Sequence, residues 1–597
     1  MIFALMTGLS AMAQYAPAGD RIKTQWASEV SPDNALREYP RPMMTRSDWK
    51  NLNGLWNYAI TPKESKVPVT YDGTILVPFC IESSLSGVQK EVGPDKALWY
   101  QIDFTVPKSW KGQHVLLHFG AVDWSAEVYV NDIKVGSHTG GYTAFSFDIT
   151  PALNVKTNSL VVRVWDPTDA SYIPHGKQVR KPQGIFYTAV TGIWQTVWLE
   201  PVPESYIASL LTTPDPENAK VTVTPEVACP TSNDLCEVQV LYQGKPVASG
   251  KALGGQSVEV TMPEGFLLWT PDHPHLYDMK VTLWRNGKVT DRVESYFAMR
   301  CFGTQRDDNG IVRLTLNGKP VFQFGPLDQG WWPDGLYTAP TDEALAYDVQ
   351  KTKDLGFNMI RKHVKVEPAR WYYHCDRIGM IVWQDMPSGG RGPGWQTTRY
   401  FEGPESVRTL ESEECYKKEW TEIINSLKSV PCIGVWVPFN ESWGQFKTTE
   451  IVEMTKKLDP TRLVNPASGG NFYACGDILD LHHYPEPKMV LYDPTRATVL
   501  GEYGGIGRKV EGHTWVQDQG WGYVEFDSEA QVTDTYVEYA NQLYKMITQG
   551  FSAAVYTQTT DCETELNGLM TYDRKVVKLD PQRLLQINRK ISHALAE

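Results

Sequence analysis

The strongest constraint in this chain is a change of rhythm near residue 311. Beyond it, short apolar runs alternate with amphipathic stretches, a pattern typical of parallel strands joined by helices. Eight candidate strands occupy residues 321–325, 358–362, 380–385, 433–440, 462–467, 479–483, 498–503 and 553–558. Helical patterns lie between several of them, at 342–355, 370–378, 415–429, 450–458 and 533–548. These repeats predict a (β/α)8 barrel. An open doubly wound sheet is the alternative, but no glycine-rich loop follows the first strand.

The part of the chain before the barrel reads as all-β. Alternating runs at 100–106, 114–119, 126–130, 160–165 and 194–199 predict a jelly-roll sandwich over residues 14–203, with Asn131-Asp132-Ile133 as a hairpin turn. Further runs at 220–225, 236–242, 257–262, 277–285 and 290–298 predict an immunoglobulin-like sandwich over 204–303. The predicted fold class is therefore multidomain: a jelly-roll β-sandwich, an immunoglobulin-like sandwich and a TIM barrel over 304–597.

The first residues predict export. An apolar run over residues 2–9 leads to Ala11-Met12-Ala13, which fits signal-peptidase cleavage and predicts a signal peptide over 1–13. A disordered apolar tail is the alternative. No later run reaches the roughly 18 apolar residues of a membrane span. We therefore expect a secreted or periplasmic protein with no membrane partner.

Charge and cysteine usage exclude several kinds of site. The net charge is −13 and no block of Lys or Arg occurs, so no nucleic-acid partner is predicted. Nine scattered cysteines without a Cys/His cluster predict no zinc site, and we expect neither a metal nor a cofactor. Cys229 and Cys236 could close a short disulfide loop, which the sequence leaves open.

The ends of the predicted barrel strands carry polar side chains. Catalytic groups of such barrels lie at the carboxyl ends of the strands. Here those ends carry Arg361 and His363, Asp385, Asn440-Glu441, His482-His483-Tyr484, Glu502 and Gln558. Glu441 and Glu502 follow strands four and seven, so they face each other across the barrel mouth. Two opposed carboxylates are what cleavage of a glycosidic bond needs, whereas a lone glutamate there would favour an ion pair.

Several motifs resemble those of glycoside hydrolase family 2, the family of β-galactosidases, β-glucuronidases and β-mannosidases. The segments are Val437-Pro438-Phe439-Asn440-Glu441-Ser442-Trp443, Gly501-Glu502-Tyr503-Gly504, Trp99-Tyr100, Gly120-Ala121-Val122-Asp123 and Gly192-Ile193-Trp194-Gln195. The resemblance covers nearly the whole chain after the predicted signal peptide. It implies that Glu441 is the general acid/base and Glu502 the nucleophile of a double displacement.

The resemblance also implies roles for three neighbours. Asn440 resembles the residue that hydrogen-bonds the sugar 2-hydroxyl, Tyr484 resembles a tyrosine that holds the nucleophile, and Arg361 resembles the arginine beside it. The other candidate substrate-binding residues are His363, Asp328, His483, Trp395, Gln558 and Asp166. Of these, Asp328 follows the first strand, Trp395 lies in a Gly/Pro-rich loop, and Asp166 lies on a sandwich loop.

Departures from the family pattern bear on the sugar. The place of the Asn-x-Lys pair that grips a uronic acid in β-glucuronidases reads Glu565-Leu566-Asn567-Gly568, so the cation is absent. The segment Lys362-His363-Val364-Lys365 replaces Ser-His-Tyr-Pro, with His363 as a stand-in, and the usual strand-eight Trp is Tyr556. An acidic-plus-His magnesium site has no counterpart after Asp385.

The first hypothesis is an exo-acting retaining β-D-galactosidase acting on oligosaccharides or glycans. Alternatives are the same mechanism on an α-L-arabinopyranoside or, lower in rank, a β-glucuronide or β-mannoside. A transglycosidase and a non-catalytic carbohydrate-binding protein also remain as hypotheses. The sequence leaves the sugar, its linkage and the oligomeric state open, although family members are often homo-oligomers.

Overall fold

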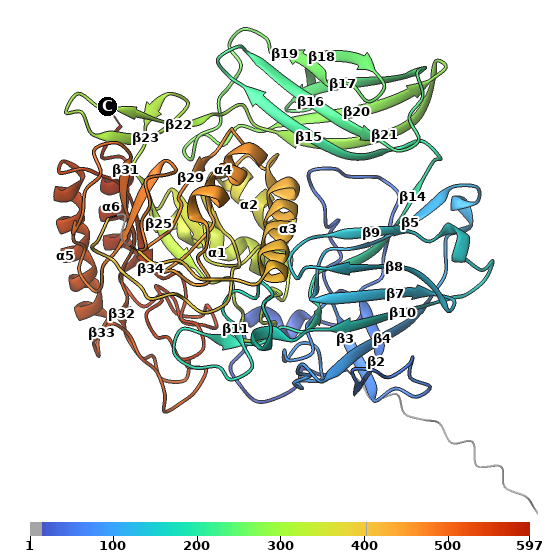
Figure 1. Ribbon diagram of the computed structural model, residues 1–597, viewed down its shortest axis with the longest axis horizontal. Helices are drawn as coiled ribbons and strands as arrows, with labels where there is room; N and C mark the ends of the chain where they lie inside the picture. Colours follow the sequence, from blue (N-terminus) through green and yellow to red (C-terminus); the bar gives the residue numbers. More distant parts are fainter. Residues whose placement is uncertain (1–14, 401–402, 597) are drawn as a thin grey trace, which may run out of the picture.

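The chain folds into three units, which Figure 1 shows in one view. The computed structural model describes residues 15–400 and 403–596. The N-terminal sandwich lies on the right of Figure 1, the second sandwich crosses the top and the barrel occupies the left. The predicted multidomain fold class is confirmed, including the order of the units along the chain.

Two antiparallel sheets form the N-terminal sandwich. One contains, in spatial order, β3 (Gly73–Val77), β2 (Gly54–Pro62), β4 (Lys96–Phe104), β10 (Asn158–Trp165), β7 (Ser125–Val130) and β8 (Ile133–Thr139). The other contains β1 (Lys50–Asn51), β14 (Val197–Val202), β5 (His114–Phe119) and β9 (Phe145–Asp148). Asn131 and Asp132 join β7 to β8 with φ of 49° and 65°, the backbone that two-residue hairpins favour. The predicted hairpin is therefore confirmed.

The second sandwich packs two smaller sheets. One contains β15 (Ile207–Asp215), β16 (Lys220–Val227) and β19 (Val258–Thr261), and the other contains β18 (Lys245–Leu253), β17 (Asp234–Tyr242), β20 (Tyr277–Arg285) and β21 (Lys288–Phe297). Over the first seven residues of β17 and β20 every second residue is buried, because successive side chains of a strand point to opposite faces. The thiols of Cys229 and Cys236 are both free.

Eight parallel strands form the barrel. They are β25 (Gln323–Asp328), β26 (Met359–Lys362), β27 (Ile381–Asp385), β28 (Ile433–Val437), β29 (Leu463–Val464), β30 (Ile478–His482), β31 (Ala497–Gly504) and β34 (Phe551–Thr557). Their order is β29-β28-β27-β26-β25-β34-β31-β30, so the last strand lies beside the first and the barrel is nearly closed. All eight predicted strands are present, with boundaries shifted by a few residues.

Helices cover the outside of the barrel (Figure 1). They are α1 (Asp342–Asp354), α2 (Ala369–Ile378), α3 (Leu410–Leu427), α4 (Thr448–Leu458), α5 (Glu529–Ile547) and α6 (Pro581–Ser592). Local sequence sets where they begin. Thr341 accepts the Ala344 amide at the start of α1, and Ser528 with Gln531 forms a capping box at the start of α5.

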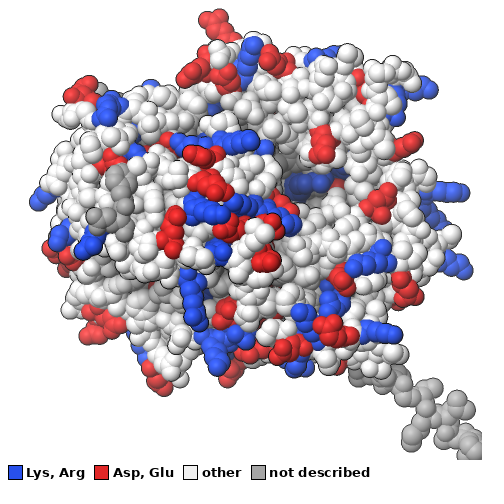
Figure 2. All heavy atoms as spheres, in the orientation of Figure 1, with Lys and Arg blue, Asp and Glu red and all other residues white. Residues whose placement is uncertain are grey.

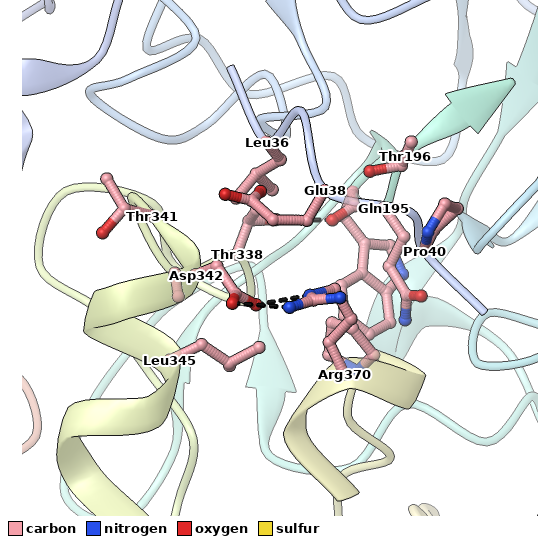
Figure 3. Close-up of a pocket in the computed structure, with 13 residues that line it drawn as sticks. Leu36, Glu38, Pro40, Gln195, Thr196, Thr338, Thr341, Asp342, Leu345 and Arg370 are labelled. Atoms are coloured by element: carbon pink, nitrogen blue, oxygen red, sulfur yellow. Dashed lines mark hydrogen bonds and ion pairs between the residues drawn. The ribbon is translucent and has the colours of Figure 1, made fainter. Parts of the chain in front are cut away.

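The N-terminal sandwich contacts the barrel beside α1 and α2. Figure 3 shows a small pocket there, lined by Leu36 and Pro40 on one side and by Leu345 on the other. Asp342 at the start of α1 accepts hydrogen bonds of 2.6 and 2.7 Å from Arg370 of α2. The same guanidinium donates to the Tyr39 carbonyl at 3.2 Å and so ties the preceding segment to the barrel.

A loop of the sandwich also reaches the barrel mouth, and Gly176 permits this approach. Its N–H donates to the carbonyls of Pro387 and Ser388 at 3.2 and 2.9 Å, both beyond β27. Its φ is +60°, and a Cβ at this position would lie 2.5 Å from the Val364 carbonyl oxygen. Only glycine combines this backbone with this contact. The neighbouring Lys177 is thereby brought to the barrel.

Export stays a prediction. The predicted signal peptide, residues 1–13, lies outside the described residues. None of the helices in the described ranges is long and apolar enough to cross a membrane. On the face seen in Figure 2, acidic and basic side chains are interspersed.

A buried ion pair stabilises the barrel and gives the first testable prediction. Arg574 donates to Asp348 at 2.9 Å and lies 3.9 Å from the centre of the Trp332 ring, with its side chain fully buried. Arg574→Met leaves Asp348 buried without a counter-charge, which costs about 3–5 kcal/mol of folding free energy. Urea unfolding followed by tryptophan fluorescence should show a lower midpoint. The control is Arg583→Met, which breaks an exposed pair with Asp534 worth about 1 kcal/mol or less. Equal midpoints for the two variants would contradict the prediction.

Candidate active site

Three groups meet at the carboxyl ends of the strands. Glu441 follows β28, His482 ends β30 and Glu502 lies in β31. One oxygen of each carboxylate and Nδ1 of His482 all lie within 4.8 Å of one another. The two glutamates that the sequence predicts to face each other are therefore brought together in one cluster.

Glu502 is the more buried of the two carboxylates. Its side chain is 7% exposed; Oε1 accepts from Arg361 at 3.2 Å and Oε2 accepts from the Tyr484 hydroxyl at 2.7 Å. Burial raises the pKa of Glu502, but the positive charges of His482, Arg361 and Lys177 outweigh burial and bring the pKa to about 2. Glu502 is therefore an ionised carboxylate over the physiological range.

The guanidinium of Arg361 donates hydrogen bonds to three side chains on the Glu502 side of the site. Its fully buried guanidinium donates to both oxygens of Asp385 at 3.1 and 2.9 Å and to Oδ1 of Asn440 at 2.7 Å, besides Glu502. The amide nitrogen of Asn440 is buried and has no hydrogen-bond partner among the described residues. Because the orientation of Asn440 is fixed by Arg361, this amide is an available donor at the site.

Glu441 lies closer to solvent. Its side chain is 14% exposed, and its N–H donates to the Ser468 carbonyl at 2.8 Å. Glu441 and Ser442 both adopt left-handed backbone, with φ of 47° and 65°. Non-glycine residues rarely adopt this conformation, and it occurs often where a functional side chain is aimed. Here it turns the chain at the end of β28 and presents Glu441 to the cluster.

His482 shares a proton with Glu441. The Ser468 hydroxyl donates to Asp480 at 2.6 Å, so its oxygen is left to accept from Nε2 of His482 at 2.7 Å. Nδ1 lies 2.8 Å from Oε1 of Glu441 and 3.4 Å from Glu502. Burial lowers the pKa of His482, but the two glutamates and Asp480 raise it by more, and the net shift is upward. One proton is therefore held between Nδ1 and Glu441.

The same three groups are close enough to hold a metal ion. Hydrogen bonds already engage each of them: His482 with Glu441, and Glu502 with both Tyr484 and Arg361. A proton-sharing cluster accounts for this arrangement. The absence of a metal stays a prediction from the sequence.

The remaining predicted residues differ in their distance from the cluster. His363 is buried beside it, with Nδ1 3.0 Å from Asp385 and 4.0 Å from Glu502. Burial, Lys177 and Arg361 all lower the pKa of His363, so the imidazole is neutral and donates to Asp385.

Four other candidates form hydrogen bonds or ion pairs with other residues of the protein. Asp328 pairs with Lys362 at 2.7 Å, and Gln558 lies in a buried amide chain with Gln329 and Asn567. His483 contacts the Glu486 carbonyl at 2.7 Å, and Asp166 accepts from Thr168 and Thr191 within the sandwich. Trp395 is 48% exposed, and its indole donates to the Gly469 carbonyl at 2.9 Å. Substrate contacts by these residues stay predictions.

The sequence did not single out several residues around the site. Tyr523 stacks on Tyr484 with ring centres 3.7 Å apart, and Tyr187 donates to Glu565. Lys177 reaches the barrel from the N-terminal sandwich. No sequence signal marks a lysine in a loop of another domain, because its position depends on how the domains dock.

Family models match three consecutive parts of the chain. They are described as glycosyl hydrolases family 2 sugar binding domain over residues 49–203, glycosyl hydrolases family 2 over 205–300, and glycosyl hydrolases family 2 TIM barrel domain over 313–490. These ranges correspond to the two sandwiches and to the larger part of the barrel.

Curated relatives carry two different activities. A beta-galactosidase of Thermoanaerobacter pseudethanolicus is 29% identical over 382 residues, covering 61% of this chain and 47% of its own. A beta-glucuronidase of Bacteroides fragilis is 24% identical over 532 residues, covering 80% and 73%. The chain spans less than half the length of some of these relatives, 44% and 47% in two cases.

Solved structures share the whole architecture. A beta-glucuronidase of Bifidobacterium dentium superposes with a TM-score of 0.72 at 19% identity, covering 93% of this chain and 99% of the other. A beta-D-glucuronidase of Dictyoglomus thermophilum gives 0.70 at 19%, covering 93% and 98%. Similarity at this level shows the common fold. Together with the three domain models, which match in the order that the structure has, it establishes that the chain belongs to glycoside hydrolase family 2.

Proposed function

We propose that this glycosidase is an exo-acting, retaining β-glycosidase that removes terminal sugars by double displacement. The observation that carries the proposal is the short separation of the two carboxylates, whose nearest oxygens lie within 4.8 Å. Retaining enzymes hold the two carboxyl groups about 5–5.5 Å apart, whereas inverting enzymes need about 6.5–9.5 Å to admit a water molecule. Exo-action is supported by the sandwich loop at Gly176, which lies against the barrel mouth.

The two carboxylates take different roles because their environments differ. Glu502 is ionised and fixed by Arg361 and Tyr484, so it attacks the anomeric carbon and forms the glycosyl–enzyme bond. Glu441 carries the proton shared with His482 and gives it to the leaving oxygen, which departs as an alcohol. In the second step Glu441 takes a proton from water, the hydroxide oxygen attacks the anomeric carbon, and Glu502 leaves as a carboxylate. The free amide of Asn440 is placed to donate to the 2-hydroxyl, a contact that strengthens in the transition state.

Two sugar classes compete for this site. A β-D-galactoside is the first candidate, because Glu565 and Asn567 replace the pair that would hold a uronic acid. An acidic sugar is the second candidate, because Lys177 of the N-terminal sandwich places its ammonium 5.7 Å from the centre of the Trp443 ring, two residues after Glu441. An α-L-arabinopyranoside lacks only the C6 group of galactose, which a pocket discriminates by about 1–3 kcal/mol, so cross-activity is expected. Transfer to a sugar acceptor remains an alternative to hydrolysis, and β-mannoside cleavage ranks lower.

Substitution of the two glutamates tests the mechanism. Glu441→Ala removes the proton donor and should lower kcat/KM on p-nitrophenyl glycosides by about 10²–10⁴-fold, and Glu502→Ala should lower it at least as much. The panel is β-D-galactoside, α-L-arabinopyranoside, β-D-glucuronide and β-D-mannoside. The matched control is Glu511→Ala, an exposed carboxylate paired with Lys509 at 3.7 Å, which should keep wild-type activity.

Azide separates the two roles in the same experiment. With Glu502→Ala, azide attacks the substrate directly and the glycosyl azide has the opposite anomeric configuration. With Glu441→Ala, azide attacks the intermediate and the product keeps the β configuration. Proton NMR of the products reads the configuration. Full activity in either glutamate variant, or exchanged stereochemistry, would show that the roles are wrongly assigned.

The proton held between His482 and Glu441 predicts the alkaline limb of the pH profile. His482 has a raised pKa, so the pair keeps its proton to higher pH than an ordinary imidazole would. His482→Asn removes that group, and the alkaline limb of kcat/KM should therefore move to lower pH. His593→Asn, in an exposed pair with Asp272, is the control and should leave the profile unchanged. An unmoved limb in His482→Asn would rule out proton sharing.

A further inference from the structure

Lys177 is a buried lysine without a carboxylate partner among the described residues. Four lysines are buried among the described residues, and three of them pair with carboxylates: Lys362 with Asp328 at 2.7 Å, Lys365 with Glu367 at 2.8 Å, and Lys578 with Asp561 at 2.5 Å. Lys177 is 5% exposed, and its ammonium forms no ion pair or hydrogen bond within the described ranges. Burying a charge costs free energy unless other groups compensate it, and here the described groups around the ammonium are two aromatic rings, those of Tyr187 and Trp443, with no acceptor oxygen.

The ammonium of Lys177 lies at the edge of the active site. It is 5.5 Å from the centre of the Tyr187 ring and 5.7 Å from that of Trp443. The Trp443 ring lies 6.3 Å from that of His363, which is beside Glu502. Buried polar atoms without a partner do not include Nζ of Lys177, so the ammonium keeps contact with solvent. A ligand that enters the barrel mouth can therefore reach it.

Electrostatic effects agree with this position. Burial raises the pKa of Glu565, and Lys177 is the largest of the influences that oppose this rise. Lys177 also contributes to the lowered pKa of Glu502. The ammonium is therefore close enough to influence both Glu565 and the nucleophile, but it forms no ion pair within 4.0 Å with either.

Backbone hydrogen bonds hold the loop on both sides of Lys177. The backbone is held on one side by Gly176, which donates to the carbonyls of Pro387 and Ser388, and on the other by the Lys177 carbonyl, which accepts from the Tyr187 N–H at 2.9 Å. An apolar side chain of similar length would fill the same space without a desolvation cost. The charge therefore points to a ligand.

We propose that Lys177 binds a negatively charged substituent, a carboxylate or a sulfate, on the terminal sugar of the substrate. This inference rests on the proposed glycosidase function. The barrel loop Glu565-Leu566-Asn567 contains no cation. The proposal places the cation in a different domain, the N-terminal sandwich. A sugar hydroxyl could accept one hydrogen bond from the ammonium but would leave its charge uncompensated, whereas an anion provides both. Glu565 repels an anion placed on its own side, so the anionic group is directed toward Lys177.

Matched pairs of substrates test the proposal. The p-nitrophenyl glycosides are β-D-glucuronide against β-D-glucoside, β-D-galacturonide against β-D-galactoside, and 6-sulfated β-D-galactoside against its unsulfated parent. We expect wild type to prefer the acidic member of at least one pair. Which pair shows this preference tells whether the bound group is a carboxylate or a sulfate. Lys177→Met should lower the acidic-to-neutral ratio of kcat/KM by about tenfold to a hundredfold. The ratio cancels any effect on Glu502 that both substrates share.

Two further variants sharpen the result. Lys177→Arg keeps the charge and should keep most of the ratio. Lys181→Met removes an exposed cation of the same loop and should leave the ratio at the wild-type value. A wild-type preference for the neutral member of every pair, or an unchanged ratio in Lys177→Met, would overturn the proposal.

Binding distinguishes failure of this inference from failure of the proposed function. If no glycoside is hydrolysed, the glycosidase proposal fails, and calorimetry then tests Lys177 independently. D-glucuronate, D-galacturonate and D-galactose 6-sulfate would be titrated into wild type and Lys177→Met, with glucose and galactose as neutral references. Tighter binding of an acidic sugar that disappears in Lys177→Met supports the anion site. Equal affinity of acidic and neutral sugars for wild type overturns it.

Discussion

Charge compensation around the guanidinium of Arg361 organises the barrel mouth. A cation that is fully buried must be surrounded by acceptors, and these come from the ends of three other strands: Asp385, Asn440 and Glu502. The same contacts that neutralise the guanidinium keep Glu502 ionised in a place where burial alone would protonate it. They also fix the amide of Asn440, whose nitrogen has no hydrogen-bond partner in the part of the chain that the structure describes. The packing of this region, the ionisation of Glu502 and the orientation of the Asn440 amide thus depend on one side chain.

The second glutamate depends on a separate chain of hydrogen bonds. Asp480 orients Ser468, Ser468 orients the imidazole of His482, and His482 holds the proton with Glu441. Two carboxylates less than 5 Å apart would otherwise compete for a proton. One is fixed as an anion by a guanidinium and the other shares its proton with an imidazole, so their roles do not interchange in the resting protein.

The parts of this site that could be predicted from the sequence are those that local pattern determines. Strand periodicity and the rule that catalytic groups lie at the ends of parallel strands identified Glu441, Glu502 and Arg361, because each lies near the end of a buried strand or a few residues beyond it. The sequence predicts His483 as a candidate substrate-binding residue, whereas the structure places His482 in the cluster. Adjacent residues at a strand end point to opposite sides, and register decides which one faces inward. The position of Lys177 could not be predicted for another reason, because it depends on how two domains dock.

Because of this docking, the residues around the site come from two different domains of the chain. The two glutamates of the cluster belong to the barrel, whereas the charge of Lys177 at the edge of the cluster is supplied by a sandwich loop held at Gly176. Selection can therefore alter which sugars are accepted through mutations near the sandwich loop while the cleavage machinery stays intact. A chimera that exchanges the sandwich would keep the catalytic glutamates of one parent and take the sugar preference of the other.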